Sequence, residues 1–371
     1  MQDESKKHCI MVGCDLHDKS MLLKVAAGKD KPETKTFENT AAQRVQMIKW
    51  LKGKSKAKHC KQIYFAYEAS GQGFGLYDEL KAAEIECWVL APTRMERSVK
   101  EKSRKTDEKD ALKILELVRG HLLAGNDLPA VWVADPELRE DRMLMRRRET
   151  VAQQLTRTKT RVTFLLKLAK IERPEIVGDA WSAADRRWLR EVGESEHYGW
   201  AMRMALQSLL RELAFLEDEE KELGKQINAL AETEPYGEAV AKLCELAGIG
   251  VLTAMVLVTE MGDASRFKNR RELAAYWGLV PSSNESGEAN DRKGHITRQG
   301  SGHVRRMLCQ AVWAAVRTDG VIGAKYRRIV ERNPRKKKIA LVAMMRQMAI
   351  KAWHIVCLVQ AQAACTSSAD G

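Results

Sequence analysis

Short apolar runs alternate with helical stretches in the first third of the chain. Residues 9–27 contain two apolar runs joined by a short polar turn, the pattern of an antiparallel hairpin. A helical stretch at 40–51 precedes a second apolar strand, QIYFAYEAS, which ends on Glu68. A Gly-rich turn, a helix near 76–83 and the strand ECWVLAP follow. Strands that alternate with helices predict an α/β layer structure.

Four carboxylates stand at the ends of these predicted elements. Asp15 ends the first strand and Glu68 ends the second. Residues 107–117 have apolar positions at helical spacing, which places Asp107 and Asp110 on one face of that helix. Such oxygen ligands suit Mg²⁺ or Mn²⁺, ions that position and polarise a phosphodiester. The structural alternative is a turn residue, a cap and first-turn acids favoured by the helix dipole.

The remainder of the chain has helical periodicity. Residues 137–173 are long and polar, with eleven Lys or Arg against five Asp or Glu. After an insert, a second helical pattern carries apolar residues at Leu206, Leu209, Leu210, Leu213, Leu216, Leu223, Ile227 and Leu230. Two long helices around an insert predict an antiparallel coiled-coil arm. We therefore predict an α/β domain at 1–135, a coiled-coil arm at 136–236 and a mostly helical domain at 237–371.

Charge and cysteine usage narrow the class of protein. The chain has 63 Lys or Arg and 50 Asp or Glu, a formal net charge of +13, and 44% hydrophobic residues. A folded basic protein of this kind usually binds a polyanion. The eight cysteines form no C-x-x-C pair, which argues against a zinc module or a disulfide framework and is typical of a cytoplasmic protein. Because charged or imidazole side chains interrupt the apolar stretch 339–365, we expect a core helix there and no membrane span.

Motifs around the four acids resemble those of one enzyme family. V-G-C-D ends on Asp15, Y-E-A-S-G contains Glu68, and K-T-D-E-K-D-A contains Asp107 and Asp110. In this order they resemble the RuvC-like (RNase H-like) DEDD domain of the insertion-sequence-110 group of bacterial transposases. These are relatives of the Piv invertases and are understood as bridge-RNA-guided recombinases. The resemblance resumes at LAGIGVLTA, FKNRRELAAYWGLVP, E-S-G and HITRQG, and it implies a helical transposase domain at the carboxy-terminal end.

The resemblance also implies a reaction and its partners. The serine of the family's S-G motif is the nucleophile that holds one DNA end as a phosphoserine, and Ser286 is the matching residue here. The four acids would bind Mg²⁺ (or Mn²⁺). Donor and target double-stranded DNA, a structured noncoding guide RNA and a composite active site in a tetramer, a dimer of dimers, are implied as well. Because a phosphoserine conserves the phosphodiester bond, exchange and religation need no external energy source.

This sequence departs from the commoner family pattern at two positions. Glu285 replaces the first serine of S-S-G, and His295 stands where Arg is more usual. Ser286 is then the aligned hydroxyl, with Ser282 and Ser283 slightly upstream. A Ser-Gly pair in a polar loop is otherwise a common turn.

Basic side chains are the candidate phosphate contacts, and a solvated basic face is the alternative. They would attract a phosphate backbone without sequence preference. The candidates are Arg146, Arg147, Arg148, Arg157, Lys159, Arg161, Arg292, Lys293 and Arg298. Residues 246–250 resemble the hairpin of a helix-hairpin-helix element and equally suit a plain interhelical turn. With no homeodomain, zinc-finger or RRM signature, no base-reading element is visible.

Two other functions fit the same residues. A Holliday-junction-resolvase-like nuclease would use the four acids to activate water and leave the serine idle. A non-catalytic RNA- or DNA-binding scaffold would use the basic residues alone.

Overall fold

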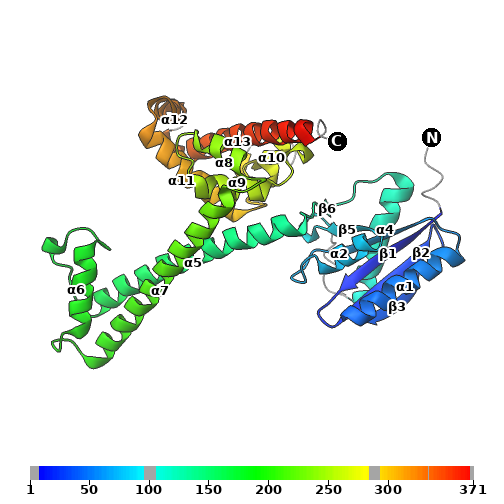
Figure 1. The fold of residues 1–371 in the computed structure, drawn as a ribbon, viewed down its shortest axis with the longest axis horizontal. Coiled ribbons are helices and arrows are strands. Elements are labelled where there is room, and N and C mark those ends of the chain that lie inside the picture. Colours follow the sequence, from blue (N-terminus) through cyan, green and yellow to red (C-terminus); the bar gives the residue numbers. More distant parts are fainter. Residues whose placement is uncertain (1–7, 96–105, 284–292, 333, 368–371) are drawn as a thin grey trace. The chain divides into compact units, whose positions relative to one another are not determined.

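The protein consists of two compact units (Figure 1). The structure, a computed structural model, describes residues 8–95, 106–283, 293–332 and 334–367. The units are Met1–Ala134 and Asp135–Gly371. The division falls at the start of a long helix, where Asp135 accepts a hydrogen bond from the N–H of Leu138 at 2.8 Å. Pro136 occupies the first turn, where its missing N–H costs nothing.

A mixed six-stranded sheet with the order β3-β2-β1-β4-β5-β6 forms the centre of the first unit. Its strands are β1 (Cys9–Leu16), β2 (Ser20–Ala27), β3 (Glu33–Glu38), β4 (Gln62–Glu68), β5 (Glu86–Leu90) and β6 (Ala130–Val131). β1 pairs antiparallel with β2, which confirms the predicted hairpin at 9–27. It pairs parallel with β4 on its other side, and β4 pairs parallel with β5.

Strand β3 has no counterpart in the sequence prediction. Its sequence, ETKTFE, buries only Phe37 because β3 lies at the edge of the sheet and faces solvent over most of its length. The apolar alternation that identifies a half-buried strand is therefore missing.

Helices cover both faces of the sheet. Helices α1 (Ala41–Ala57) and α2 (Gly75–Ala82) share an apolar cluster with one set of alternating strand residues. Helix α4 (Asp107–Ala124) packs with the other set. A short 3₁₀ turn at Pro92–Arg94 follows β5. The first unit is thus the predicted α/β layer structure.

Two long helices, α5 (Pro136–Leu168) and α7 (Trp200–Ala231), lie side by side in the second unit. Met145 of α5 shares a cluster with Ile227 of α7, whereas Val162 shares one with Leu206. The two helices therefore run antiparallel. Helix α6 (Ala183–Glu194) and a 3₁₀ turn at Glu175–Val177 form the insert between them. Supercoiling of the pair stays a prediction.

The remaining helices of the second unit surround a core centred on α9, in which every residue from Thr253 to Met261 is buried. They are α8 (Gly237–Cys244), α9 (Val251–Met261), α10 (Arg270–Tyr276), α11 (Gly302–Thr318), α12 (Gly320–Arg332) and α13 (Lys337–Ser367), with 3₁₀ turns at Ala264–Arg266 and Pro334–Lys336. Met145, Ile227 and Ala231 of the long helices belong to the same core. Residues 135–371 thus form one compact unit, and the division into 136–236 and 237–371 stays a prediction.

Helix α13 is long and apolar enough, by length and composition, to cross a membrane. One side of it is packed within the protein, because Met348, Ala349, Ala352 and Val356 are buried in the core of the second unit. This placement agrees with the predicted core helix.

Candidate active site

Two of the predicted acids stand at the same edge of the sheet. Asp15 is the last residue but one of β1, and Glu68 is the last residue of β4. The parallel register pairs Cys14 with Tyr67, one residue before each acid. Cys14 and Tyr67 both face the layer of α1 and α2. Because side chains alternate between the faces of a strand, Asp15 and Glu68 both face the layer of α4.

Gly13 lets α4 approach β1 closely. A Cβ atom at Gly13 would lie 2.3 Å from the carbonyl oxygen of Ala111 and 2.3 Å from the backbone nitrogen of Leu115. Glycine is the residue that permits such a backbone approach. Asp107 begins α4 one turn before Ala111, so this contact brings the first turn of the helix towards Asp15.

Asp15, His17 and Asp107 form a compact cluster. The Nε2 atom of His17 lies 3.0 Å from Oδ2 of Asp15 and 3.6 Å from Oδ1 of Asp107. One nitrogen or oxygen atom from each residue lies within 4.8 Å of the other two, close enough to share a metal ion. The side chain of Asp15 is 13% exposed and that of Asp107 is 58% exposed. A ligand could therefore reach the cluster from solvent.

The electrostatics of the cluster favour a cation. Burial raises the pKa of the Asp15 carboxyl above its usual value, and the charge and hydrogen bond of His17 oppose that rise. The negative charges of Asp107 and Asp110 raise the pKa further. A divalent ion would relieve this repulsion and replace the lost hydration of Asp15. The carboxylates present thus fit a hard divalent cation.

The remaining two predicted acids are placed less tightly. Within the described part of the chain, Glu68 and Asp110 fall outside the compact set. The negative charge of Asp110 nevertheless raises the pKa of Asp15, and Glu68 is the last residue of β4, the strand paired with β1.

His17 is absent from the predicted ligand set. It lies in the turn between β1 and β2, where its N–H donates to the carbonyl of Ser20 at 2.9 Å. Its own carbonyl accepts a hydrogen bond from the side chain of Asn39 at 2.9 Å. The available signal was its position two residues after Asp15, because residues two apart on an extended strand share a face.

Two short strands flank the segment that carries the predicted nucleophile. β7 (Pro281–Ser283) pairs antiparallel with β8 (Lys293–Ile296). Ser286 and Arg292 lie outside the described residues. The hydroxyl of Ser282, an upstream candidate, donates to the carbonyl of His295 across this hairpin at 3.0 Å. Ser282 thus has a structural partner in the hairpin.

Backbone contacts fix the base of the hairpin. A Cβ atom at Gly278 would lie 2.1 Å from the carbonyl oxygen of Gln299. A Cβ atom at Gly300 would lie 1.9 Å from the carbonyl oxygen of Tyr276, the last residue of α10. Trp277, which precedes Gly278, is fully buried. The guanidinium of Arg305 donates to the carbonyl of Trp277 at 3.1 Å. The motifs Y-W-G-L-V-P and H-I-T-R-Q-G therefore meet at this point.

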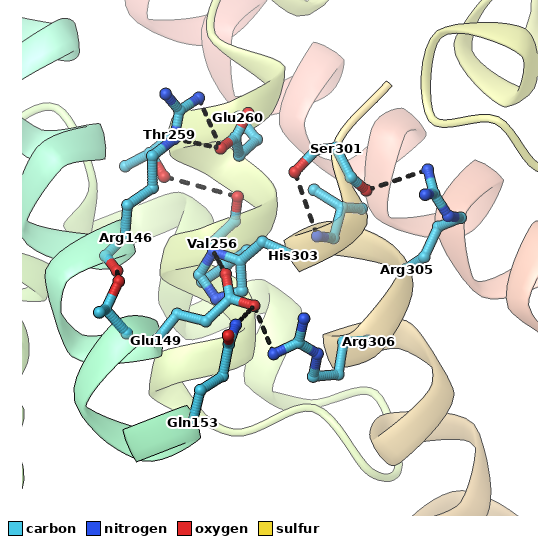
Figure 2. A network of polar contacts seen from close by, with 12 residues as sticks. Arg146, Glu149, Gln153, Val256, Thr259, Glu260, Ser301, His303, Arg305 and Arg306 are labelled. Atoms are coloured by element: carbon cyan, nitrogen blue, oxygen red, sulfur yellow. Dashed lines mark hydrogen bonds and ion pairs between the residues drawn. The ribbon is translucent and has the colours of Figure 1, made fainter. Parts of the chain in front are cut away.

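A network of charged side chains joins the start of α11 to α5 and α9 (Figure 2). A carboxylate oxygen of Glu149 lies 3.1 Å from Nδ1 of His303, and the other lies 2.6 Å from the guanidinium of Arg306. Burial lowers the pKa of His303. Arg146, a predicted phosphate contact, donates to Glu260, which is 4% exposed. This network holds the helix that follows the hairpin.

Most of the other predicted phosphate contacts on α5 form ion pairs with glutamates of α7. The pairs are Arg147–Glu219, Arg148–Glu220, Lys159–Glu217 and Arg161–Glu212, with N–O distances of 3.5, 2.9, 3.7 and 3.6 Å. Partly exposed pairs of this kind contribute up to about 1 kcal/mol each to stability, so a phosphate can replace the glutamate at each basic side chain. Arg157 and Arg298 are exposed, and Lys293 is in β8.

The glycine-containing turn between α8 and α9 serves helix packing. A Cβ atom at Gly248 would lie 2.1 Å from the carbonyl oxygen of Ala311 in α11. Close packing therefore explains Gly248, and phosphate binding by residues 246–250 stays a prediction.

Both halves of the chain match family models of transposases. Residues 240–327 match the family described as "Transposase IS116/IS110/IS902 family", and residues 12–171 match the DEDD model of the IS110 group, described as "Transposase". The second match contains all four predicted acids. This chain belongs to the IS110/IS116 family of DEDD transposases. Enzymes of this class cut and rejoin DNA.

Individual relatives extend the similarity over most of the transposase. This chain is 30% identical over 289 residues to the putative transposase y4qE of Sinorhizobium fredii (strain NBRC 101917 / NGR234). The match covers 76% of this chain and 66% of that relative. The transposase for insertion sequence element IS1533 of Leptospira borgpetersenii is 26% identical over 83% of this chain and 85% of its own length. The pilin gene-inverting protein of Moraxella bovis is 28% identical over 31% of this chain and 35% of its own length.

Proposed function

We propose that this transposase is the recombinase of a bacterial insertion sequence and acts in the bacterial cytoplasm, at the nucleoid. It cuts and rejoins donor and target DNA through a phosphoserine at Ser286, with Mg²⁺ (or Mn²⁺) held by Asp15, Glu68, Asp107 and Asp110. The observation that carries the proposal is the approach of Asp15 and Asp107 to a common point, from two elements far apart in the sequence. That point lies within the region matched by the DEDD model.

The proposed reaction conserves bonds at phosphorus. The hydroxyl of Ser286 loses its proton, and its oxygen forms a bond to phosphorus. The bond from phosphorus to one deoxyribose oxygen breaks, and that oxygen gains a proton. A deoxyribose hydroxyl of another strand then reverses these steps and releases the serine. When bound, a divalent ion stabilises negative charge on the phosphate oxygens.

Guidance by a structured RNA and assembly into a dimer of dimers are parts of the same proposal. The net charge of +13 and the lack of a base-reading motif in the sequence support a protein that binds nucleic-acid backbones while paired RNA selects the site. The four acids belong to the first unit and Ser286 to the second, which supports a composite site shared between subunits.

A cleavage assay tests this function. The protein is incubated with Mg²⁺, co-purified RNA and end-labelled DNA, and the products are separated under denaturing conditions. We expect a protein–DNA adduct that disappears in Ser286→Ala. Asp15→Asn should also abolish it while leaving salt-sensitive DNA binding nearly intact, because the change removes a charge without changing the shape of the side chain. An adduct that persists in Ser286→Ala would rule out this nucleophile.

A metal-dependent nuclease is the second candidate. It is favoured by the location of Asp15, His17 and Asp107 in one unit, since activation of water there needs no residue of the second unit. Free cleaved DNA that survives Ser286→Ala and is lost in Asp15→Asn would identify this activity. Tight binding without cleavage would instead identify a scaffold.

A further inference from the structure

We infer that His17 is a nitrogen ligand of the metal centre and gives it a preference for Mn²⁺ over Mg²⁺. This inference rests on the proposed function, because it concerns the ion held by the same acids. The imidazole extends the four-acid set with a ligand of different chemistry. It is one of the three residues that come within 4.8 Å of one another, whereas Glu68 and Asp110 do not join that compact set.

The geometry places Nε2 of His17 between two carboxylates. It lies 3.0 Å from an oxygen of Asp15 and 3.6 Å from an oxygen of Asp107. A cation that binds both carboxylates would therefore also meet this nitrogen. The side chain of His17 is 44% exposed, so the imidazole can adjust its position when an ion enters.

The backbone of His17 is fixed at the start of a tight turn. Its N–H donates to Ser20, the first residue of β2, and its carbonyl accepts from Asn39, which follows β3. The neighbouring Asn39 N–H donates to Lys19 in the same turn at 3.0 Å. These hydrogen bonds hold His17 beside Asp15 without using its side chain. The imidazole is thus available to an ion at little cost in conformational freedom.

The ligand chemistry separates the two ions. Mg²⁺ prefers oxygen ligands, keeps several waters and demands near-ideal octahedral geometry. Carboxylates suit both ions, but affinity for a site with mixed nitrogen and oxygen ligands rises along the first-row transition series, of which Mn²⁺ is the early member. One imidazole beside two carboxylates therefore favours the transition ion.

Mn²⁺ binding measured by electron paramagnetic resonance tests the inference without DNA cleavage. The signal of free Mn²⁺ is titrated with the full-length protein, and Mg²⁺ is added as competitor. For the wild type, half-displacement of Mn²⁺ should need at least about a tenfold excess of Mg²⁺. His17→Ala should weaken Mn²⁺ binding by about tenfold or more, the scale seen when residues supporting metal ligands are lost, and leave the Mg²⁺ affinity nearly unchanged. The excess of Mg²⁺ needed for half-displacement should therefore fall by the same factor. His17→Asp, which makes the ligands all oxygen, should shift the preference towards Mg²⁺.

Two further variants make the outcomes distinguishable. His59→Asn removes an exposed imidazole elsewhere in the first unit and should leave both affinities unchanged. Asp15→Asn should remove binding of both ions. If Asp15→Asn has no effect, the proposed metal site itself is wrong. If Asp15→Asn abolishes binding but His17→Ala binds Mn²⁺ as tightly as the wild type or more tightly, His17 merely occupies the site before the ion, and this inference is wrong.

Discussion

The acid cluster of the first unit and the hairpin base of the second are held by different forces. Both contain a glycine that allows two backbones to touch, Gly13 in one and Gly300 in the other. Around Gly13 the contacts are mainly apolar packing between α4 and the sheet, with one ion pair, Lys24–Glu108, at 3.0 Å. Near Gly300, the following helix α11 is also tied to α5 by Glu149, which contacts His303 and Arg306. The approach of α4 to β1 should therefore depend mainly on shape, whereas the position of α11 should also depend on the protonation of His303.

The largest effect is expected where two backbones are in close contact. Gly13→Ala places a methyl group 2.3 Å from backbone atoms of α4, which cannot move aside as a flexible side chain could. Overpacking of this kind typically costs about 1–3 kcal/mol and sometimes more. We expect a loss of that size in the free energy of unfolding, measured by denaturant titration. Metal binding should weaken as well, because the first turn of α4 carries Asp107.

Gly71→Ala is the matched control for this change. A Cβ atom there would meet no heavy atom within 4 Å, so stability and metal binding should stay near the wild-type values. Equal behaviour of the two variants would show that contact between α4 and β1 does not position the acids.

A smaller, pH-dependent effect is expected in the second unit. Burial lowers the pKa of His303, with Arg306 and Arg146 acting in the same direction and Glu149 and Glu260 opposing them. The unfolded chain then takes up more protons below the ordinary value of 6.5, so the free energy of unfolding should fall as the pH falls through that value. His303→Gln should make this dependence shallower.

Hydrogen-exchange protection of α11 at pH 7.5 and pH 5.5 (roughly one unit on either side of the ordinary histidine pKa) measures the effect. Protection of α4 in the first unit serves as the internal control. If α11 loses the same protection in the wild type and in His303→Gln, the network around Glu149 does not confer the pH dependence.

The contrast also explains which features the sequence could predict. The alternation at 9–27 and the acids at 107 and 110 were visible because apolar periodicity and carboxylate spacing are local signals. The roles of Gly13 and Gly300 were hidden, since each depends on a backbone from a distant part of the chain. His17 was overlooked because its spacing of two residues from Asp15 is a weak local signal, and its approach to Asp107 depends on a distant helix. Pairing of the α5 arginines with α7 glutamates was likewise invisible until the two helices were placed side by side.

The smallest effect concerns those arginines and asks which of them meet nucleic acid. Arg148 is 2.9 Å from Glu220, whereas Arg157 is exposed on the same helix. A phosphate must compete with Glu220 to bind Arg148. It does not compete with Glu220 to bind Arg157. Arg157→Ala should therefore lower DNA affinity severalfold and reduce the slope of log affinity against log salt by about 0.9, the value for one phosphate contact. Arg148→Ala should change the affinity and the salt slope less. Binding is measured without divalent ions to prevent cleavage. Equal losses in the two variants would mean that DNA displaces the α7 glutamates and that the basic face of α5 binds as a whole.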